Sequence, residues 1–317
     1  MRPSFSIIVF TVLSGAGYGL LFVLGLSLAW TAGTASGDAC VALGIPLVVG
    51  TLLVSAGLLA SVGHLGRPLR AWRAFSQWRS SWLSREGVAA VATYLPLAVV
   101  AGLLFGPADT RVPLRVGAAL LAAGCVATVY CTAHIYSSLK PVRAWRNGYV
   151  LPGYLLLGLH AGLLWWFALA GVPVEGNHAD AMLPFWLFDA ILVAPACIIL
   201  KLAYWKWLDL PARGPDAGDA TGLGGLGTVR SFEQPHTEEN YLTHEMGFAL
   251  ARKHARRLRT IAVWAMVLAP FAIPALAWLI GWPASWVALA LGMLGIFVER
   301  WLFFAEARHA VIAYYGG

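Results

Sequence analysis

The sequence predicts an all-α, polytopic membrane protein with eight transmembrane helices, on the evidence of its composition and its apolar runs. Hydrophobic residues make up 59% of the chain and charged residues only 12%, unlike the mix of a soluble domain. The apolar residues form runs of about 20, the length that crosses a hydrocarbon core of about 30 Å. We expect one membrane domain, residues 1–317, with spans at about 6–30, 40–62, 87–105, 114–137, 152–171, 184–205, 260–281 and 284–304.

The charges of the connections predict the side of the membrane that each one faces. Basic residues gather between spans 2 and 3, 4 and 5, and 6 and 7, whereas the alternate connections hold few. The positive-inside rule therefore places the basic connections and both termini in the cytoplasm. The net charge of +7 reflects this topology and needs anionic lipid headgroups, not nucleic acid, as its partner.

The connection between spans 2 and 3 carries the residues that best fit a redox site. Span 2 ends at His64 and span 3 begins at Glu86, so an antiparallel hairpin brings the two to one depth. Histidine titrates near neutrality, and a glutamate in a low-dielectric setting is shifted toward it. Both can therefore exchange the protons that a quinone takes up on reduction, with Arg67 and Arg85 beside them. The structural alternative is a helix-capping histidine and an interfacial ion pair between Arg85 and Glu86.

A seven-residue motif after span 2 recurs after span 4. Arg67–Arg73 reads R-P-L-R-A-W-R, and Lys140–Arg146 reads K-P-V-R-A-W-R. An offset that covers two spans preserves direction across the membrane, which favours duplicated helical hairpins. The alternative is that the two loops carry the same residues for the same local reason. In each loop proline would end a helix, and arginine and tryptophan would anchor it at the membrane interface.

The longest connection, residues 206–259, is predicted to be cytoplasmic and to dock a soluble partner. Residues 211–227 have the composition of a flexible linker. Gly222–Gly227 matches G-x-G-x-x-G, but no strand is predicted before it, so we reject a dinucleotide fingerprint. From Thr237 onward acidic residues precede basic ones, which suits a helix. A basic, lipid-binding helix is the alternative use of this segment.

Neither the cysteines nor the histidines predict a metal centre. The four cysteines are Cys40, Cys125, Cys131 and Cys197. None of them forms a C-x-x-C pair, so the chain cannot supply the thiolates of an iron–sulfur cluster. A haem held by His134 and His160 is the weaker alternative because their depths match poorly, and we expect a buried, hydrogen-bonded role for His160.

Three acidic residues lie within or near the later spans. Asp189 in span 6 is expected to be a hydrogen-bonded structural group, with a proton site as the alternative. Glu299 and Glu306 near the end of span 8 are expected to pair with the adjacent Arg300 and Arg308.

Four linked motifs resemble the membrane anchor subunit of the dimethyl sulfoxide reductase type of molybdoenzyme. They are Ser14–Gly19, His64–Pro68, Ser81–Glu86 and Glu245–Arg256. The resemblance covers nearly the whole chain and implies eight helices without haem or cluster. It also implies a partner with 4Fe–4S clusters, joined to a catalytic subunit that carries molybdopterin guanine dinucleotide. The family's quinone-site histidine and glutamate correspond to His64 and Glu86, and further candidates around a bound ubiquinone or menaquinone are Tyr18, Arg67, Ser84 and Arg85.

The predicted orientation selects among the functions that the resemblance implies. A cytoplasmic site in a bacterial inner membrane fits partners docked from the cytoplasm, and residues 228–257 resemble the anchors of quinone-reducing sulfite dehydrogenases. We therefore expect electrons to pass from sulfite through the partner's clusters to quinone. The first alternative is a quinol-oxidising anchor of a terminal reductase, and a remoter one is a transporter or a purely structural anchor.

Overall fold

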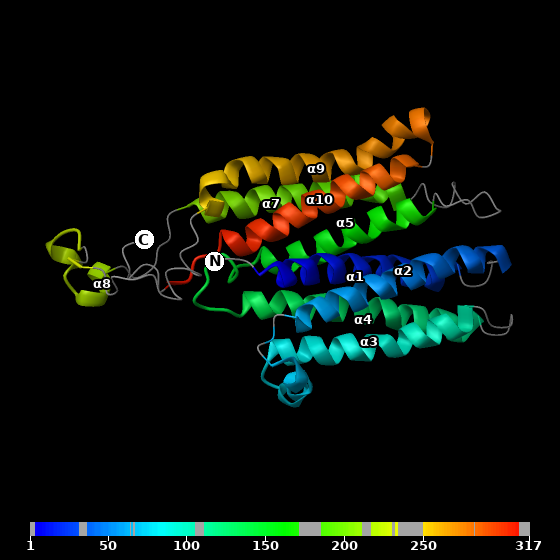
Figure 1. Cartoon of the computed structure of the whole chain (residues 1–317), viewed down its shortest axis with the longest axis horizontal. Coiled ribbons are helices and arrows are strands. Elements are labelled where there is room, and N and C mark those ends of the chain that lie inside the picture. Colours follow the sequence, from blue (N-terminus) through cyan, green and yellow to red (C-terminus); the bar gives the residue numbers. More distant parts are fainter. Residues whose placement is uncertain are drawn as a thin grey trace.

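The computed structural model folds the chain into a bundle of long helices (Figure 1). It describes residues 4–31, 37–63, 65, 67–104, 111–170, 185–210, 217–229, 232–233, 250–281 and 283–310. The all-α, polytopic prediction is confirmed. Within the described part of the chain, seven helical stretches are long and apolar enough to cross a membrane, one of them running from Phe185 to Asp209. The remaining predicted span, 260–281, lies largely within a further long helix, Leu250–Ile280.

The helices follow the predicted spans closely. The long ones are α1 (Phe5–Thr31), α2 (Gly37–Val62), α3 (Trp82–Leu104), α4 (Arg111–Ser137), α5 (Val150–Ala170), α7 (Ala194–Asp209), α9 (Leu250–Ile280) and α10 (Pro283–Ala305). The short ones are the 3₁₀ helix η1 (Pro68–Gln77), the π-helical turn η3 (Asp189–Val193), α8 (Ala217–Thr221) and η4 (Gly224–Leu226).

Helix α1 is the centre of the bundle and packs against α2, α4 and α5. Consecutive helices form the hairpins α1–α2, α3–α4 and α9–α10, while α2 and α3 touch only lightly. Figure 1 shows α3 and α4 on one side of α1, and α5, α7, α9 and α10 on the other. The core is apolar and continuous from α1 through α10.

Glycines let α1 and α5 approach until their backbones touch. A Cβ atom added to Gly19 of α1 would overlap the carbonyl group of Gly158, and one added to Gly162 of α5 would overlap the backbone of Gly19. Small residues at helix crossings are the usual means of close packing in membranes, because van der Waals contact replaces the hydrophobic effect there. The crossing therefore fixes the position of α1 against α5.

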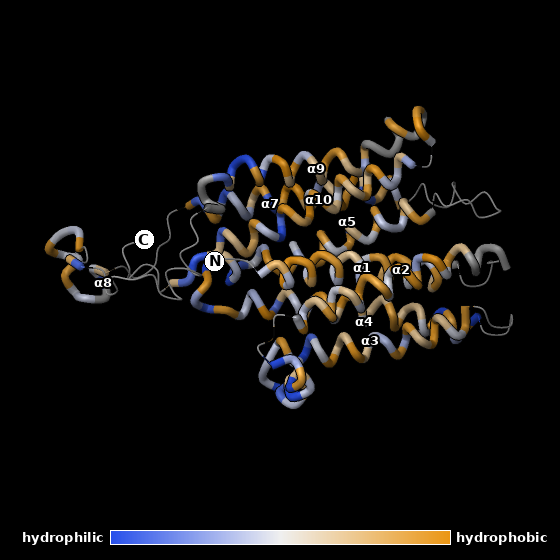
Figure 2. Tube along the Cα trace, viewed as in Figure 1, coloured by the Kyte–Doolittle hydropathy of each residue, from blue (hydrophilic) through white to orange (hydrophobic). Residues whose placement is uncertain are grey.

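Polar residues gather at one end of the bundle, which we call the basic end. It contains the start of α1, α3, α5 and α9, the end of α2, α4, α7 and α10, and the connections between them (Figures 1 and 2). Figure 2 shows hydrophilic residues there and mainly hydrophobic ones along the helices. The predicted basic connections thus share one end, as the charge pattern required.

The two copies of the recurring motif differ in structure. Residues 68–77 form η1, whose residues are largely exposed, Leu69 at 92% and Trp72 at 67%. Residues 140–146 instead pack into the bundle: Val142 and Trp145 are buried, and the Trp145 indole donates to the Phe303 carbonyl over 3.0 Å. The motif therefore does not give matching loops, and the duplication of hairpins stays a prediction.

The long connection after α7 is described in part. Residues 217–229 form α8 and η4, so the G-x-G-x-x-G match follows a short helix and not a strand, in line with its rejection as a dinucleotide site. Helix α9 begins at Leu250, and its first three turns carry the predicted basic cluster. The acidic residues of the predicted helix start lie outside the described residues.

Candidate functional site

Glu86, the predicted acid of the site, is buried just after the first turn of α3. Its side chain turns toward α4, where the Thr132 hydroxyl donates a hydrogen bond of 2.5 Å to Glu86 Oε1. Only 6% of Glu86 is exposed. The predicted structural alternative, an ion pair with Arg85, does not form between these two described residues, because the Arg85 side chain turns back to the loop that precedes α3. Glu86 is therefore a carboxyl group held inside the bundle by a single described hydroxyl.

Arg85 and Ser84 fasten the η1 loop to α3. Arg85 Nε donates to the Trp78 carbonyl over 3.0 Å, and a terminal nitrogen donates to the Arg79 carbonyl over 2.6 Å. The Arg85 guanidinium also lies 4.3 Å from the centre of the Trp82 ring. The Ser84 hydroxyl donates to the Ala74 carbonyl. These two candidates hold the loop in position and make no described hydrogen bond to Glu86.

The other two loop candidates have no observed contact with the site. Arg67 is exposed at the start of η1 and makes no side-chain capping hydrogen bond. His64 lies outside the described residues, so its place beside Glu86 stays a prediction.

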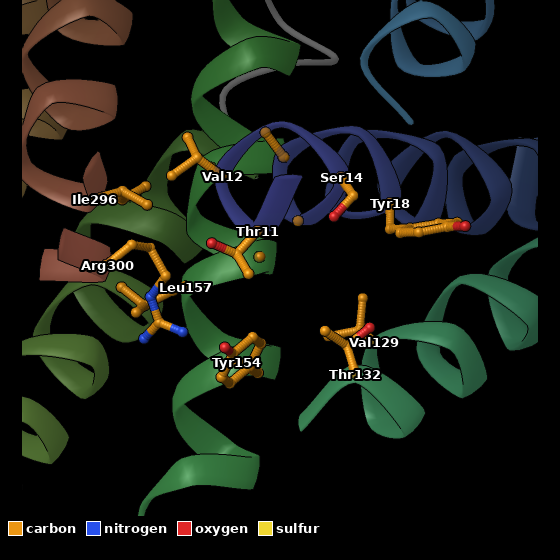
Figure 3. A pocket seen from close by; sticks show the side chains of 14 residues that line it. Thr11, Val12, Ser14, Tyr18, Val129, Thr132, Tyr154, Leu157, Ile296 and Arg300 are labelled. Carbon is orange, nitrogen blue, oxygen red and sulfur yellow. The ribbon is translucent and has the colours of Figure 1, made fainter. Parts of the chain in front are cut away.

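Tyr18, the candidate from α1, lies between two cavities. Its side chain is 3% exposed, and its hydroxyl has no hydrogen-bond partner among the described residues. It lines a polar cavity together with Thr132, the partner of Glu86 (Figure 3). It also lines an apolar cavity on the neighbouring face of α1. The cavity therefore brings Tyr18 of α1 together with Thr132 of α4, which bonds Glu86 of α3.

The polar cavity lies between α1, α4, α5 and α10 and has a volume of about 20 Å³. Three buried donors that lack a described partner line it: the hydroxyls of Tyr18 and Tyr154 and Nη1 of Arg300. Buried polar groups are almost always hydrogen-bonded, and an orphan points to a missing water or ligand. About one water molecule fits such a volume. Figure 3 shows these side chains with those of Thr11 and Ser14 around the same space.

The apolar cavity is larger, about 200 Å³, and lies between α1, α4 and α5. Among the described residues that line it, Tyr18 alone carries a hydroxyl group. An apolar cavity of about 150 Å³ is enough to bind benzene, so this one has room for a six-membered ring. The residues that line it are Tyr18, Gly19, Phe22, Cys125, Val126, Val129, Leu155, Leu156, Gly158 and Leu159.

A buried ionic cluster lies next to the polar cavity, and the sequence analysis missed its lysine. Lys201 of α7 pairs with Glu299 Oε1, and Arg300 Nε donates to Glu299 Oε2 over 2.5 Å. All three side chains are at most 5% exposed. The Arg300 guanidinium also lies 4.4 Å from the centre of the Tyr154 ring. The signal that could have found this cluster is the lysine inside the sixth predicted span, because ionisable residues within spans are rare and usually functional.

The predicted acid pairs are half correct. Glu299 pairs with Arg300 as expected, but the predicted pairing of Glu306 with Arg308 is wrong. Glu306 instead accepts hydrogen bonds from Arg259 at the start of the seventh span, the shortest 2.7 Å, and Arg259 also pairs with Asp209. Arg308 follows the end of α10, and the chain turns there, so Arg259 on the neighbouring helix is better placed.

His160 and Asp189 form a buried pair in the middle of the bundle. His160 Nδ1 donates to Asp189 Oδ1 over 2.8 Å, and both side chains are fully buried. This confirms a hydrogen-bonded role for each. His134 stacks on the Trp82 ring at 4.4 Å, away from His160. Within the described part of the chain, no group of three or more metal-binding side chains comes together.

The long apolar helices define a polytopic helical membrane protein, and the comparisons with known proteins give its family. Residues 1–206 match the family model of the DMSO reductase anchor subunit (DmsC), and the chain belongs to this family. It is similar to a subunit of the sulfite dehydrogenase of Allochromatium vinosum, with 31% identity over 334 aligned positions that cover 99% of each chain. No solved structure matches the chain significantly.

Proposed function

We propose that this anchor subunit passes electrons between a partner's iron–sulfur clusters and membrane quinone, with sulfite as the electron source. The observation that carries the proposal is that Tyr18 lines both an apolar cavity of ring size and the polar cavity that it shares with Thr132, the partner of Glu86. Similarity along the whole chain to a sulfite dehydrogenase subunit supports the choice of sulfite.

The chemistry of the site suits a quinone. Reduction adds two electrons and two protons, so the ring oxygens need hydrogen-bond donors and a source of protons. Tyr18 donates to one ring oxygen, and Glu86 supplies a proton. His64 is the proposed second donor, as the family resemblance implies. Arg85 and Ser84 act indirectly, because they hold the loop that carries His64 and Arg67.

The proposed partners dock at the basic end. Electron transfer weakens steeply with distance, so the nearest cluster has to approach the end of the bundle that contains Glu86. The exposed arginines of the η1 loop and the connection of residues 206–259 provide the docking surface, which we place in the cytoplasm of a bacterium. The partners are an iron–sulfur subunit and, beyond it, a molybdopterin catalytic subunit.

The reverse direction, in which quinol feeds a terminal reductase, uses the same residues and is the second candidate, favoured by the family's description as a DMSO reductase anchor. The two directions of electron flow are distinguished by the reaction that the assembled complex catalyses. Reduction of a ubiquinone analogue by sulfite supports the first, and oxidation of a quinol analogue by dimethyl sulfoxide, without sulfite activity, supports the second.

The site is tested in the purified complex with His64→Ala and Glu86→Gln. We expect either change to slow quinone-linked sulfite oxidation by about 10²–10⁴-fold, while sulfite oxidation with an artificial dye stays at the wild-type level. Glu306→Gln is the matched control, because this residue lies at the same end and lines neither cavity. Full quinone-linked turnover in both variants would overturn the assignment of the site.

A further inference from the structure

The Lys201–Glu299–Arg300 cluster carries an excess positive charge inside the bundle. Two cations surround one carboxylate, and the side chains are 5%, 1% and 3% exposed. Burying charge costs several kcal/mol per ion even when the ions are paired. Ionisable groups within spans are therefore rare and usually take part in function. The proposed quinone site does not by itself use this cluster.

Arg300 connects the cluster to the polar cavity. Nε and one terminal nitrogen of Arg300 bind the two oxygens of Glu299, at 2.5 and 3.0 Å. The other terminal nitrogen, Nη1, has no partner among the described residues, and Arg300 lines the cavity beside Tyr154 (Figure 3). A residue that is 3% exposed thus presents a free donor to a space of water size.

Glu86 is connected to the same cavity by Thr132. Thr132 lines the cavity and donates to Glu86, and its oxygen retains a lone pair for another donor. One water molecule in the cavity accepts from Arg300 Nη1 or a tyrosine hydroxyl and donates to Thr132 or Tyr154. Such a molecule has the two to four polar partners that a buried water needs.

We infer that the Lys201–Glu299 pair stores a proton and passes it through water in the polar cavity, beside Arg300 and Tyr154, to Thr132 and from there to Glu86. The inference rests on the proposed function, because it assigns the cluster a role in supplying protons to the quinone. Arg300 keeps its own proton and holds Glu299 and the water in place, so it is a positioning residue.

The step balances as follows. Two electrons from the partner's iron–sulfur clusters and two protons convert the quinone to the quinol. Glu86 gives one proton to a ring oxygen and becomes a carboxylate, and the other ring oxygen takes the second proton from water at the basic end. Lys201 then releases a proton by way of Glu299 to the water in the cavity, and the Thr132 hydroxyl accepts a proton from that water while it passes its own proton to Glu86. The cluster falls from one net positive charge to zero, and Lys201 recovers its proton from water at the basic end.

The test uses two variants of the assembled complex. Lys201→Met combined with Glu299→Gln removes the proton store but leaves one net positive charge, on Arg300, as in the wild type. Tyr154→Phe removes a single hydroxyl group that lines the polar cavity and is proposed to hold the water. We expect quinol formation in a single turnover to slow by about 10²-fold in the double variant. In both variants the solvent deuterium isotope effect should rise and the KM for quinone should stay unchanged.

The control is His160→Gln combined with Asp189→Asn, which alters an equally buried pair elsewhere. This control should leave the single-turnover rate and the solvent isotope effect of the assembled complex unchanged. Wild-type rates and isotope effects in both test variants would overturn the inference while leaving the quinone site intact. A wild-type complex without quinone-linked turnover would instead refute the proposed function. An experimental structure should show a water bonded to Tyr154 or Arg300, and a dry cavity would contradict the route.

Discussion

The hydroxyl groups of Ser55 and Tyr94 lie 2.7 Å apart and join α2 to α3. These two helices otherwise touch only lightly, so the hydrogen bond is a main connection between them near the proposed site. Tyr18 on the neighbouring helix offers a contrast, because its hydroxyl is buried without a described partner. The Tyr94 hydroxyl is therefore a structural group, whereas the Tyr18 hydroxyl is the proposed ligand-binding group.

Tyr18→Phe should lower quinone-linked turnover or raise the KM for quinone by about 5- to 10-fold, which corresponds to one hydrogen bond of about 1 kcal/mol. The thermal stability of the complex should hardly change, because no described protein hydrogen bond is lost. Tyr94→Phe is the control and should show the opposite, a stability loss of about 1 kcal/mol with turnover retained. Equal effects of both changes on stability and turnover would argue against a ligand at Tyr18.

Gly19→Ala should destabilise the subunit strongly. The new Cβ atom would overlap the carbonyl of Gly158, and because both atoms belong to backbones, one helix has to move. Overpacking typically costs about 1–3 kcal/mol, and we expect the upper end. The measurement is the yield and melting temperature of the complex in detergent. Gly102→Ala, where a Cβ meets nothing within 4 Å, should leave both unchanged or slightly improved.

The stability of the complex should depend on pH through Glu306. Burial raises the pKa of Glu306 above its usual value, and Arg259 offsets part of this rise. A carboxyl group with a raised pKa in the folded state binds more protons there than when unfolded, so stability falls as pH rises from the usual value to the raised one. Glu306→Gln should flatten the dependence of melting temperature on pH in that window. An unchanged pH profile would show that Glu306 does not cause it.

Reporter fusions should establish the orientation. A fusion after Thr221, between α8 and η4, should behave as cytoplasmic, and one in the connection of residues 172–184 as exported, because the basic residues lie at the other end of the bundle. Export of the Thr221 fusion would reverse the topology and remove the reason for docking the partners in the cytoplasm.

Most of the fold was predictable because membrane-spanning helices can be recognised in the sequence as long apolar runs. Each span needs about 20 apolar residues, and α2, for example, ends at Val62, the last residue of the predicted span. The burial of Glu86 was also predictable, since it follows the basic loop directly at the start of an apolar run.

The lateral arrangement of the helices was not predictable from these patterns. The hairpin argument turned Glu86 toward α2, but its described partner is Thr132 of α4. The same limit explains the missed pair of Lys201 and Glu299, which lie on different helices and meet only after packing. Hydropathy records depth in the membrane and not rotation about a helix axis, so contacts between helices require the three-dimensional structure.

The glycine crossing of α1 and α5 also decides how a quinone enters. Gly19 and Gly158 form part of the wall of the apolar cavity, and because the two backbones touch there, a ligand cannot pass between these helices. The lining residues that are partly exposed are on α4 and α5 and include Val126, 40% exposed, and the half-buried Leu155 and Leu159. The opening therefore faces the acyl chains beside α4 and α5. A quinone using it would exchange sideways with the lipid phase, and turnover would follow the concentration and mobility of quinone in the bilayer.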